Sequence, residues 1–362
     1  MKKTFVAILL VSLALTGCKV IPTAPQPTAE IKIEPSATAE PAPTETASLE
    51  PTAEPTAAVE NLPAPLFSAL ISSSQPNFSR MVWSADGKSL AMLASDHMVV
   101  LDAETLQQIY AFANPSIMIL DFSADGRTLL TTTDQQNLTL IDLSTNQTRT
   151  IDTGAQFVTA SFSPDGSLIL VGTADNWKAE IYDAASGSLR LELTGFETAA
   201  PVYSVRFAEN VTDVLWVSRA EVQLQNIASQ ELMPALSHED FVNAVARAHS
   251  LDLIATSAAG TIDGNMLPIV HIWDAATGEK LLQMQMPQAV VALNFSADDA
   301  ILAAGAADGV HLYKTADMSE AGIITDQNNG VADVRFSPAD NRLAIVDGDG
   351  ILRLYQINPQ AN

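Results

Sequence analysis

The stretch SFSPDG, at residues 161–166, recurs along the chain and decides the fold. Close copies are VWSADG at 82–87 and DFSADG at 121–126, and weaker copies follow at 206–208, 246–248, 294–298 and 335–340. Each copy contains one marker residue, in order Trp83, Phe122, Phe162, Phe207, Arg247, Phe295 and Phe336. Successive markers are 39, 40, 45, 40, 48 and 41 residues apart. Seven copies at this period indicate a closed or solenoid array of small units.

The pattern inside each copy predicts four short strands. Runs rich in Val, Ile, Leu and aromatic residues are separated by Ser-x-Asp-Gly or Ala-Asp-Gly turns. The third run ends in an aromatic or aliphatic residue followed by Asp, as at Tyr182-Asp183 and Trp273-Asp274. Four antiparallel strands in about 40 residues form one blade of a β-propeller. The predicted fold is therefore all-β: a seven-bladed β-propeller of four-stranded antiparallel blades over residues 65–362.

The last unit predicts how the ring closes. Its strands are expected at 331–336, 343–346 and 351–355, which leaves no outer strand, because only 356–362 follow. An unused strand-like run, PLFSALI at 65–71, precedes the first marker. We expect this run to pair with 351–355 and remove an exposed edge.

The repeats resemble the WD40 family, particularly its bacterial members, over residues 66–358. The best copy is VHIWD at 270–274, followed by AATG at 275–278. The family's Asp between the second and third strands is matched at five positions: Asp96, Asp134, Asp175, Asp308 and Asp349. The family's Gly-His pair is absent, with only Ser237-His238 approximating it, and Trp ends the third strand once. The Asp–His–Ser/Thr–Trp hydrogen-bond network of the family is therefore expected to be incomplete in every blade.

The first residues predict export and lipidation. Two lysines precede an apolar run at 5–15, which is too short to span a bilayer as a helix. The run ends in a motif that resembles a bacterial lipobox: Leu15, Thr16, Gly17 and Cys18. The resemblance implies a signal peptide over 1–17, cleavage by signal peptidase II, and acyl chains such as palmitate on Cys18. It also implies a place in the bacterial cell envelope, on the periplasmic or cell-surface side. An ordinary secretory signal is the alternative.

Residues 18–64 are predicted to be a lipidated, disordered tether. Between 19 and 64 the chain has nine prolines and seven glutamates, and most other residues are Ala and Thr. Such a segment buries too little apolar surface to offset its chain entropy. Proline and glutamate favour extended conformations, so the segment is expected to hold the next domain away from the membrane. A filler with no length requirement is the alternative.

Composition and motifs exclude several classes of site. The net charge of −24 argues against nucleic-acid binding, and a single cysteine excludes a disulfide framework or a Cys-rich zinc site. No Walker, Gly-x-Ser-x-Gly, His-Glu-x-x-His or dinucleotide motif occurs. The five histidines fall at different places in different repeats, so no metal site or cofactor is expected. The DGDG sequence at 347–350 is interpreted as a hairpin turn rather than a calcium loop.

These observations favour a non-enzymatic scaffold that binds a protein of the cell envelope and acts as a monomer. One alternative is a propeller-class enzyme, such as a quinoprotein dehydrogenase or a lactonase-type hydrolase. That class needs a cofactor-stacking Trp or converging Glu, His and Asp ligands on the central channel. The other alternative is an envelope assembly factor, analogous to the propeller lipoprotein that helps to insert outer-membrane barrels. It differs from the scaffold only in its partner.

The irregular repeat lengths predict the binding face. The steps of 45 and 48 residues place insertions at 174–178, 195–201 and 259–268, all on one side of the disc over blades three to five. Loops and exposed aromatic or Met side chains are common at interfaces. The candidate partner-binding residues are therefore Trp177, Phe196, Asn265, Met266 and Leu267. Neutral variation in loop length is the alternative.

Overall fold

Strands make up the regular secondary structure of the residues that the structure describes. The computed structural model describes residues 65–70, 81–93, 97–113, 121–132, 134, 136–154, 156–173, 178–193, 204–208 and 211–358. Within these ranges, 28 strands form seven four-stranded antiparallel sheets. None of the described segments is a helix long and apolar enough to cross a membrane. The predicted signal peptide with Leu15, Thr16, Gly17 and Cys18, and the predicted tether, lie outside the described residues.

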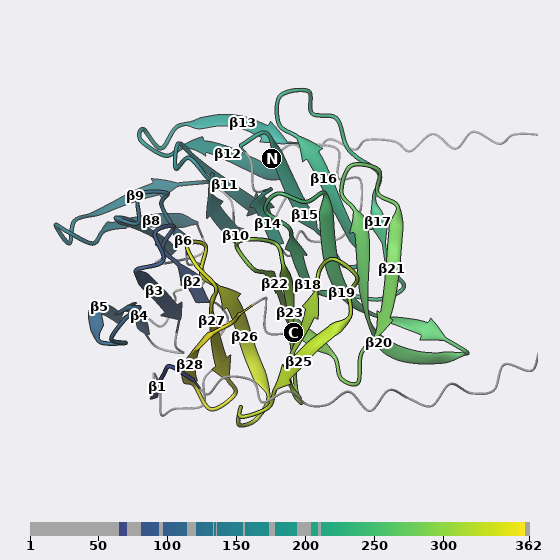
Figure 1. Ribbon diagram of the computed structural model, residues 1–362. Helices are drawn as coiled ribbons and strands as arrows, with labels where there is room; N and C mark the ends of the chain where they lie inside the picture. The colour runs from purple at the N-terminus through teal and green to yellow at the C-terminus, as the bar shows by residue number, and fades with distance from the viewer. Residues whose placement is uncertain are drawn as a thin grey trace, which may run out of the picture. The chain divides into compact units, whose positions relative to one another are not determined.

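The sheets follow one another along the chain as blades, and their order is visible in Figure 1. From the inner to the outer strand, blades 1 to 3 are β2 (Met81–Trp83), β3 (Ser89–Leu93), β4 (His97–Asp102), β5 (Gln108–Ala113); β6 (Asp121–Phe122), β7 (Thr128–Thr132), β8 (Asn137–Asp142), β9 (Thr148–Asp152); and β10 (Phe157–Phe162), β11 (Leu168–Thr173), β12 (Ala179–Asp183), β13 (Leu189–Leu193). Blades 4 and 5 are β14 (Ser204–Phe207), β15 (Asp213–Val217), β16 (Glu221–Asn226), β17 (Leu236–Ser237); and β18 (Val242–Arg247), β19 (Leu253–Ile262), β20 (Asn265–Asp274), β21 (Lys280–Gln285). Blades 6 and 7 are β22 (Val290–Phe295), β23 (Ile301–Ala306), β24 (Gly309–Lys314), β25 (Glu320–Ile324); and β26 (Val331–Phe336), β27 (Arg342–Asp347), β28 (Ile351–Gln356), β1 (Phe67–Leu70).

The Ser-x-Asp-Gly turn between the first two strands of a blade is held by its own side chains. In blade 1, Ser84 Oγ donates to Asp86 Oδ1 over 2.7 Å and accepts from the backbone N of Ser89 over 2.9 Å. Gly87 has a φ of 68°, a left-handed conformation that suits glycine. The same bonds recur at 123–128 and 163–168. The repeated motif is therefore a turn whose local chemistry specifies the hairpin.

The hydrophobic core lies between the blades. Seven clusters of buried apolar residues each join two neighbouring blades, including the pair of blades 7 and 1. Phe162 of blade 3, for example, packs with Leu130 and Ile151 of blade 2. Each sheet is thus buried on both faces, which explains the nearly continuous apolar runs of strands such as β11.

The ring closes by pairing the two ends of the described chain. Strand β1 is antiparallel to β28, with Phe67 opposite Leu354 and Leu70 opposite Ile351. An additional bond runs from the backbone N of Leu66 to the carbonyl of Leu354, over 2.7 Å. The predicted seven-bladed fold, and its closure by the run that starts at residue 65, are confirmed.

Candidate functional site

The β19–β20 hairpin of blade 5 is longer than every other described hairpin of the ring. Each of its strands has ten residues, whereas the other described strands have two to six. The strands are joined by Asp263 and Gly264, with φ values of 50° and 80°, as in the two-residue turns that match strand twist. The insertion predicted at 259–268 is therefore a continuation of two strands rather than an irregular loop (Figure 1).

The tip of this hairpin carries three of the predicted partner-binding residues. Asn265 is exposed, Met266 is 59% exposed and Leu267 is half-buried. Strand β21 pairs with β20 only from Ile269 onward. Trp177 and Phe196 lie outside the described residues. The structure thus brings Asn265, Met266 and Leu267 together at one projecting tip.

A hollow of about 260 Å³ lies at the base of this hairpin, beside the connection from β17 to β18. That connection is tied to the hairpin by Glu239, whose Oε2 accepts the backbone N–H of Thr261 over 2.9 Å. The side chains with polar atoms that line the hollow are Ser237, His238, Glu239, Thr261, His271, Lys280 and Gln283. The hollow is thus a polar site between blades 4 and 5, on the side of the disc predicted to bind a partner.

Two histidines meet at this hollow, which corrects the expectation of scattered histidines. The ring centroids of His238 and His271 are 5.4 Å apart, and both rings contact Trp273. No third ligand joins them, because the described residues contain no group of three His, Cys, Asp or Glu side chains that could hold a metal ion.

A hydrogen-bond network fixes the first of these rings. His238 Nε2 lies 2.7 Å from Thr256 Oγ1, which also accepts the indole N–H of Trp273 over 2.8 Å. His238 Nδ1 lies 3.3 Å from the carbonyl oxygen of Ala220. Three of the four groups of the network expected from the family resemblance therefore meet in blade 5. A backbone carbonyl takes the place of the Asp, so the network is incomplete here, as expected.

Burial keeps both imidazoles neutral near physiological pH. Burial lowers the pKa of His238 to about 4, against smaller opposing contributions from backbone hydrogen bonds. Burial, then the ammonium of Lys280, then His238 itself lower the pKa of His271 to about 4. His271 is only 5% exposed, and its Nδ1 has no hydrogen-bond partner among the described residues. His271 therefore lines the hollow and has a buried Nδ1 without a described hydrogen-bond partner.

We expect the two imidazoles to make the propeller sensitive to mild acid. The unfolded chain takes up protons at its histidines near pH 6.5, whereas the folded protein resists protonation down to about pH 4. Their contribution to stability is therefore full above pH 6.5 and is lost as the pH falls toward 4. For the buried His271 the loss is on the order of 2–3 kcal/mol. Urea midpoints measured between pH 7 and pH 4.5 check this.

The variant for that measurement is His271→Gln. It removes one of the two imidazoles and should weaken the dependence of the urea midpoint between pH 6.5 and 4.5. The Asp groups with lowered pKa, such as Asp142 at about 2, lose their contribution only below about pH 4. A midpoint that stays constant down to pH 4.5 in the unmodified protein would show that these imidazoles are not held neutral.

The central channel is lined by the inner strands, whose free edges are satisfied by side chains from neighbouring blades. Asp121 Oδ2 accepts the backbone N–H of Phe162 over 2.7 Å, and Asn294 Oδ1 accepts that of Phe336 over 2.6 Å. Asp333 Oδ2 accepts the N–H of Met81 over 3.0 Å. An edge strand needs such partners for its unpaired backbone groups. These channel side chains therefore link neighbouring blades by hydrogen bonds.

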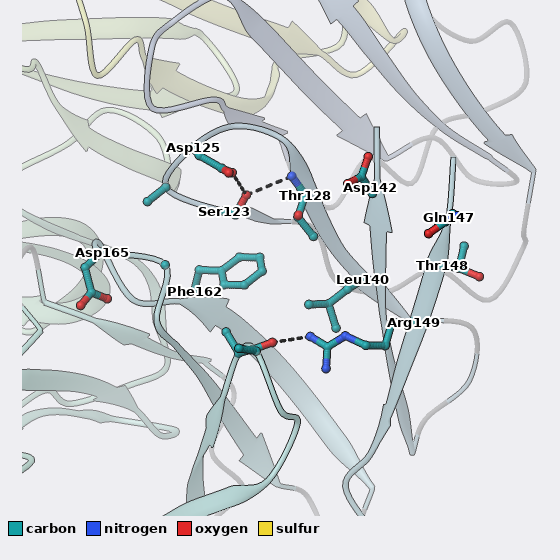
Figure 2. A pocket seen from close by; sticks show the side chains of 14 residues that line it. Ser123, Asp125, Thr128, Leu140, Asp142, Gln147, Thr148, Arg149, Phe162 and Asp165 are labelled. Atoms are coloured by element: carbon teal, nitrogen blue, oxygen red, sulfur yellow. Dashed lines mark hydrogen bonds between the residues drawn. The ribbon is translucent and has the colours of Figure 1, made fainter. Parts of the chain in front are cut away.

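A second, more open hollow of about 530 Å³ lies on the opposite side of the disc, between blades 2 and 3. Figure 2 shows Arg149 reaching from β9 to a backbone carbonyl of the facing blade, which is that of Ala184. The carboxylates around it are engaged in their own turns: Asp125 with Ser123, and Asp142 with the turn that follows it. The polar groups of this hollow thus hold the two blades in place.

Two further predictions concern Asp side chains in turns. The turn at 347–350 is held by Asp347, whose Oδ1 accepts the backbone N–H of Asp349 and of Ile351, which confirms the turn interpretation. Among the Asp residues matched to the WD40 pattern, Asp134 accepts the backbone N–H groups of residues 136 and 137. Asp96 and Asp175 lie outside the described residues. Turn capping explains Asp134, whereas Asp308 Oδ2 lies 3.4 Å from His311 Nε2 and Asp349 Oδ1 accepts the side-chain amide of Asn329 over 2.6 Å.

Sequence reasoning missed the residues that complete the hollow of blade 5: Glu239, His271, Lys280 and Gln283. The available signal was VHIW at 270–273 recurring as VHLY at 310–313, which places a histidine at the same point of two consecutive blades. Contact between His271 and His238 depends on how blades 4 and 5 pack against each other. A local sequence motif does not encode that packing.

Comparison with known proteins adds no assignment to this geometry. No protein-family model matches the chain, and no curated protein matches it either. The seven-bladed propeller, the projecting hairpin and the polar hollow are the features from which a function is inferred.

Proposed function

We propose that this chain is an interaction scaffold, anchored by a lipid on Cys18 to a membrane of the bacterial cell envelope and exposed outside the cytoplasm. It is proposed to present a WD40-like propeller on a tether to a protein partner, as a monomer and without a catalytic step. The propeller fold supports the scaffold, and the lipobox-like sequence at 15–18 supports the anchor.

The observation that carries the proposal is the projecting β19–β20 hairpin. Its tip exposes Met266, a flexible apolar side chain of the kind enriched at interfaces. The outer edge of β20 is not covered by β21 at residues 265–268, apart from a bond from the backbone N of Met286 to the carbonyl of Pro268. Such an edge can accept a strand of another protein. A tip with an apolar anchor and an open strand edge suits a protein partner.

The rest of the ring supports this role by packing the base of the hairpin into the core. The buried cluster between blades 4 and 5 includes Leu215, Leu236 and Trp273, and the cluster between blades 5 and 6 includes Phe295. Binding to a preformed surface costs less ordering entropy than binding to a flexible one. A propeller therefore presents its loops without a folding cost at the moment of binding.

The test uses the full-length protein in living bacterial cells. A photo-crosslinking residue in place of Asn265 is expected to yield a discrete adduct with a partner protein. The same residue in place of Glu104, an exposed turn position on the opposite side of the disc, should not. Met266→Ala should reduce the adduct several-fold while the melting temperature changes by about 1 °C or less, because surface substitutions perturb folding little. Equal adducts from both positions would contradict the proposed face.

The anchoring arm of the same experiment follows labelled palmitate. The wild-type protein should incorporate the label and fractionate with membranes. Cys18→Ser should take up no label and should be either unprocessed or released, since 5–15 is too short to hold the mature chain in a bilayer. A wild-type protein that never takes up fatty acid would overturn the anchor but not the scaffold.

A further inference from the structure

Blades 5 and 6 carry the same pattern on their third strand. His271 lies two residues before Trp273 on β20, and His311 lies two residues before Tyr313 on β24. Across the sheet, Trp273 is opposite Lys280 and Tyr313 is opposite Glu320. The two histidines are therefore equivalent, and their blades differ in the charge at the first residue of the outer strand.

In blade 6 the equivalent imidazole is bound by a carboxylate. His311 Nδ1 lies 3.2 Å from Glu320 Oε1, and its Nε2 lies 3.4 Å from Asp308 Oδ2. The side chain of His311 is 7% exposed and that of Glu320 is 45% exposed, so a carboxylate at the surface pairs with a buried imidazole. The carboxylate of Glu320 thus satisfies the Nδ1 of a buried imidazole.

In blade 5 the same atom has no such partner. The Nδ1 of His271 is buried and makes no hydrogen bond with a described residue. The residue that corresponds to Glu320 is Lys280, whose ammonium lies 5.2 Å from the centroid of the Trp273 ring. A hollow of about 260 Å³ lies beside both groups. The site therefore has a cation and an imidazole Nδ1 without a described partner where the neighbouring blade has a carboxylate, while the side chain of Gln283 also bonds the imidazole.

We propose that the hollow of blade 5 binds a carboxylate group from outside the chain, held between His271 Nδ1 and the ammonium of Lys280. The carboxylate would play the part for His271 that Glu320 plays for His311, and Lys280 would neutralise its charge. The hollow is smaller than the pockets that take drug-sized ligands, so it suits a small organic acid or a single acidic side chain. This site goes beyond the proposed scaffold and does not require it.

Binding at this site is coupled to protonation. A carboxylate beside His271 favours the charged imidazole, so the pKa of His271 should rise by about 1 pH unit or more. The other titratable groups that line the hollow are His238, Glu239 and Lys280. Of these, Glu239 also favours the charged imidazole, while Lys280 and His238 oppose it. By linkage, the affinity for the carboxylate should increase as the pH falls from 7 to 5.

The test is an NMR titration of the full chain with acetate at constant ionic strength. The imidazole signals of His271, assigned with His271→Gln, are expected to move and saturate in the millimolar acetate range, with a rise in the pKa of His271. Chloride and neutral acetamide serve as ligand controls, and the imidazole of His97 serves as an internal control. Lys280→Gln should reduce the affinity for acetate about tenfold or more, and its melting temperature checks that it folds.

The converse variant gives blade 5 the carboxylate that blade 6 has at the equivalent position. Lys280→Glu should raise the pKa of His271 without any ligand and should abolish the response to acetate, because the chain then supplies the carboxylate itself. A linear acetate response shared with chloride, or an unchanged affinity in Lys280→Gln, would overturn the proposal. Neither result would bear on crosslinking at Asn265.

Two probes distinguish the possible sources of the carboxylate. The peptide acetyl-Ala-Glu-Ala-amide presents an acidic side chain, and its Gln counterpart is the uncharged control. Binding of the Glu peptide at least as tightly as acetate assigns the site to an acidic side chain. Binding of acetate alone assigns it to a small organic acid, and binding of neither probe overturns the site.

Discussion

Removal of residues 65–70 is expected to destabilise the whole propeller, not only blade 7. Strand β1 is the outer strand of that blade, and it comes from the opposite end of the described chain to its partner β28. Without it, β28 becomes an unpaired edge, and the ring loses the strand pairing that joins the first described strand to the last blade. We expect the melting temperature to fall by about 10 °C or more. Differential scanning calorimetry of the deletion variant measures this.

The reason for a global effect lies in the core. Because each buried cluster is shared by two blades, opening blade 7 weakens the cluster that joins it to blade 1, where Leu352 and Leu354 are fully buried. Neighbouring blades then lose their packing in turn. A deletion of six residues at 51–56, in the predicted tether, is the matched control and should leave the transition unchanged. An unaltered cooperative transition in the 65–70 variant would show that β1 is dispensable for closure.

The sequence predicted the blades well because their determinants are local. The serine and aspartate of a turn such as 84–87 bond to each other and to the adjacent backbone, so a short motif specifies a hairpin wherever it occurs. The closing strand was predictable for a related reason. The last repeat lacked a fourth strand, and a strand-like run at residue 65 had no other place.

The polar hollow was not predictable, because its parts come from different repeats. His238 lies in the connection before blade 5, whereas His271 and Lys280 lie on the third and fourth strands of that blade. Their meeting depends on the register of β20 with β21 and on how the connection folds back through Glu239. The lengths of the repeats indicated an insertion at 259–268. They did not indicate that the insertion extends two regular strands, or that the buried imidazole of His271 lies at its base.

Substitution of Arg353 by Met is expected to cost about 3–5 kcal/mol in the free energy of unfolding, the usual penalty for leaving a buried charge unpaired. Asp347 is fully buried, and its Oδ2 lies 2.6 Å from Arg353 Nη1. Burial raises the pKa of Asp347, but the hydrogen bond from Arg353 and those from backbone amides outweigh burial and hold it below its usual range. Met fills a similar volume, so the loss reports the charge rather than a cavity.

The pH dependence separates this mechanism from simple loss of packing. In the wild-type protein, the lowered pKa of Asp347 contributes stability above about pH 4 that is lost in stronger acid. In Arg353→Met, burial acts without the cation, so the pKa of Asp347 should rise and the variant should be most destabilised near neutral pH. Adding Asp347→Asn should recover part of the loss, because the amide keeps acceptor capacity without a charge. Urea unfolding of both single variants and the double variant at pH 5 and pH 7.5 measures this coupling. Equal losses at both pH values, with no recovery in the double variant, would mean that Arg353 acts through packing and that the buried ion pair does not stabilise the closing blade.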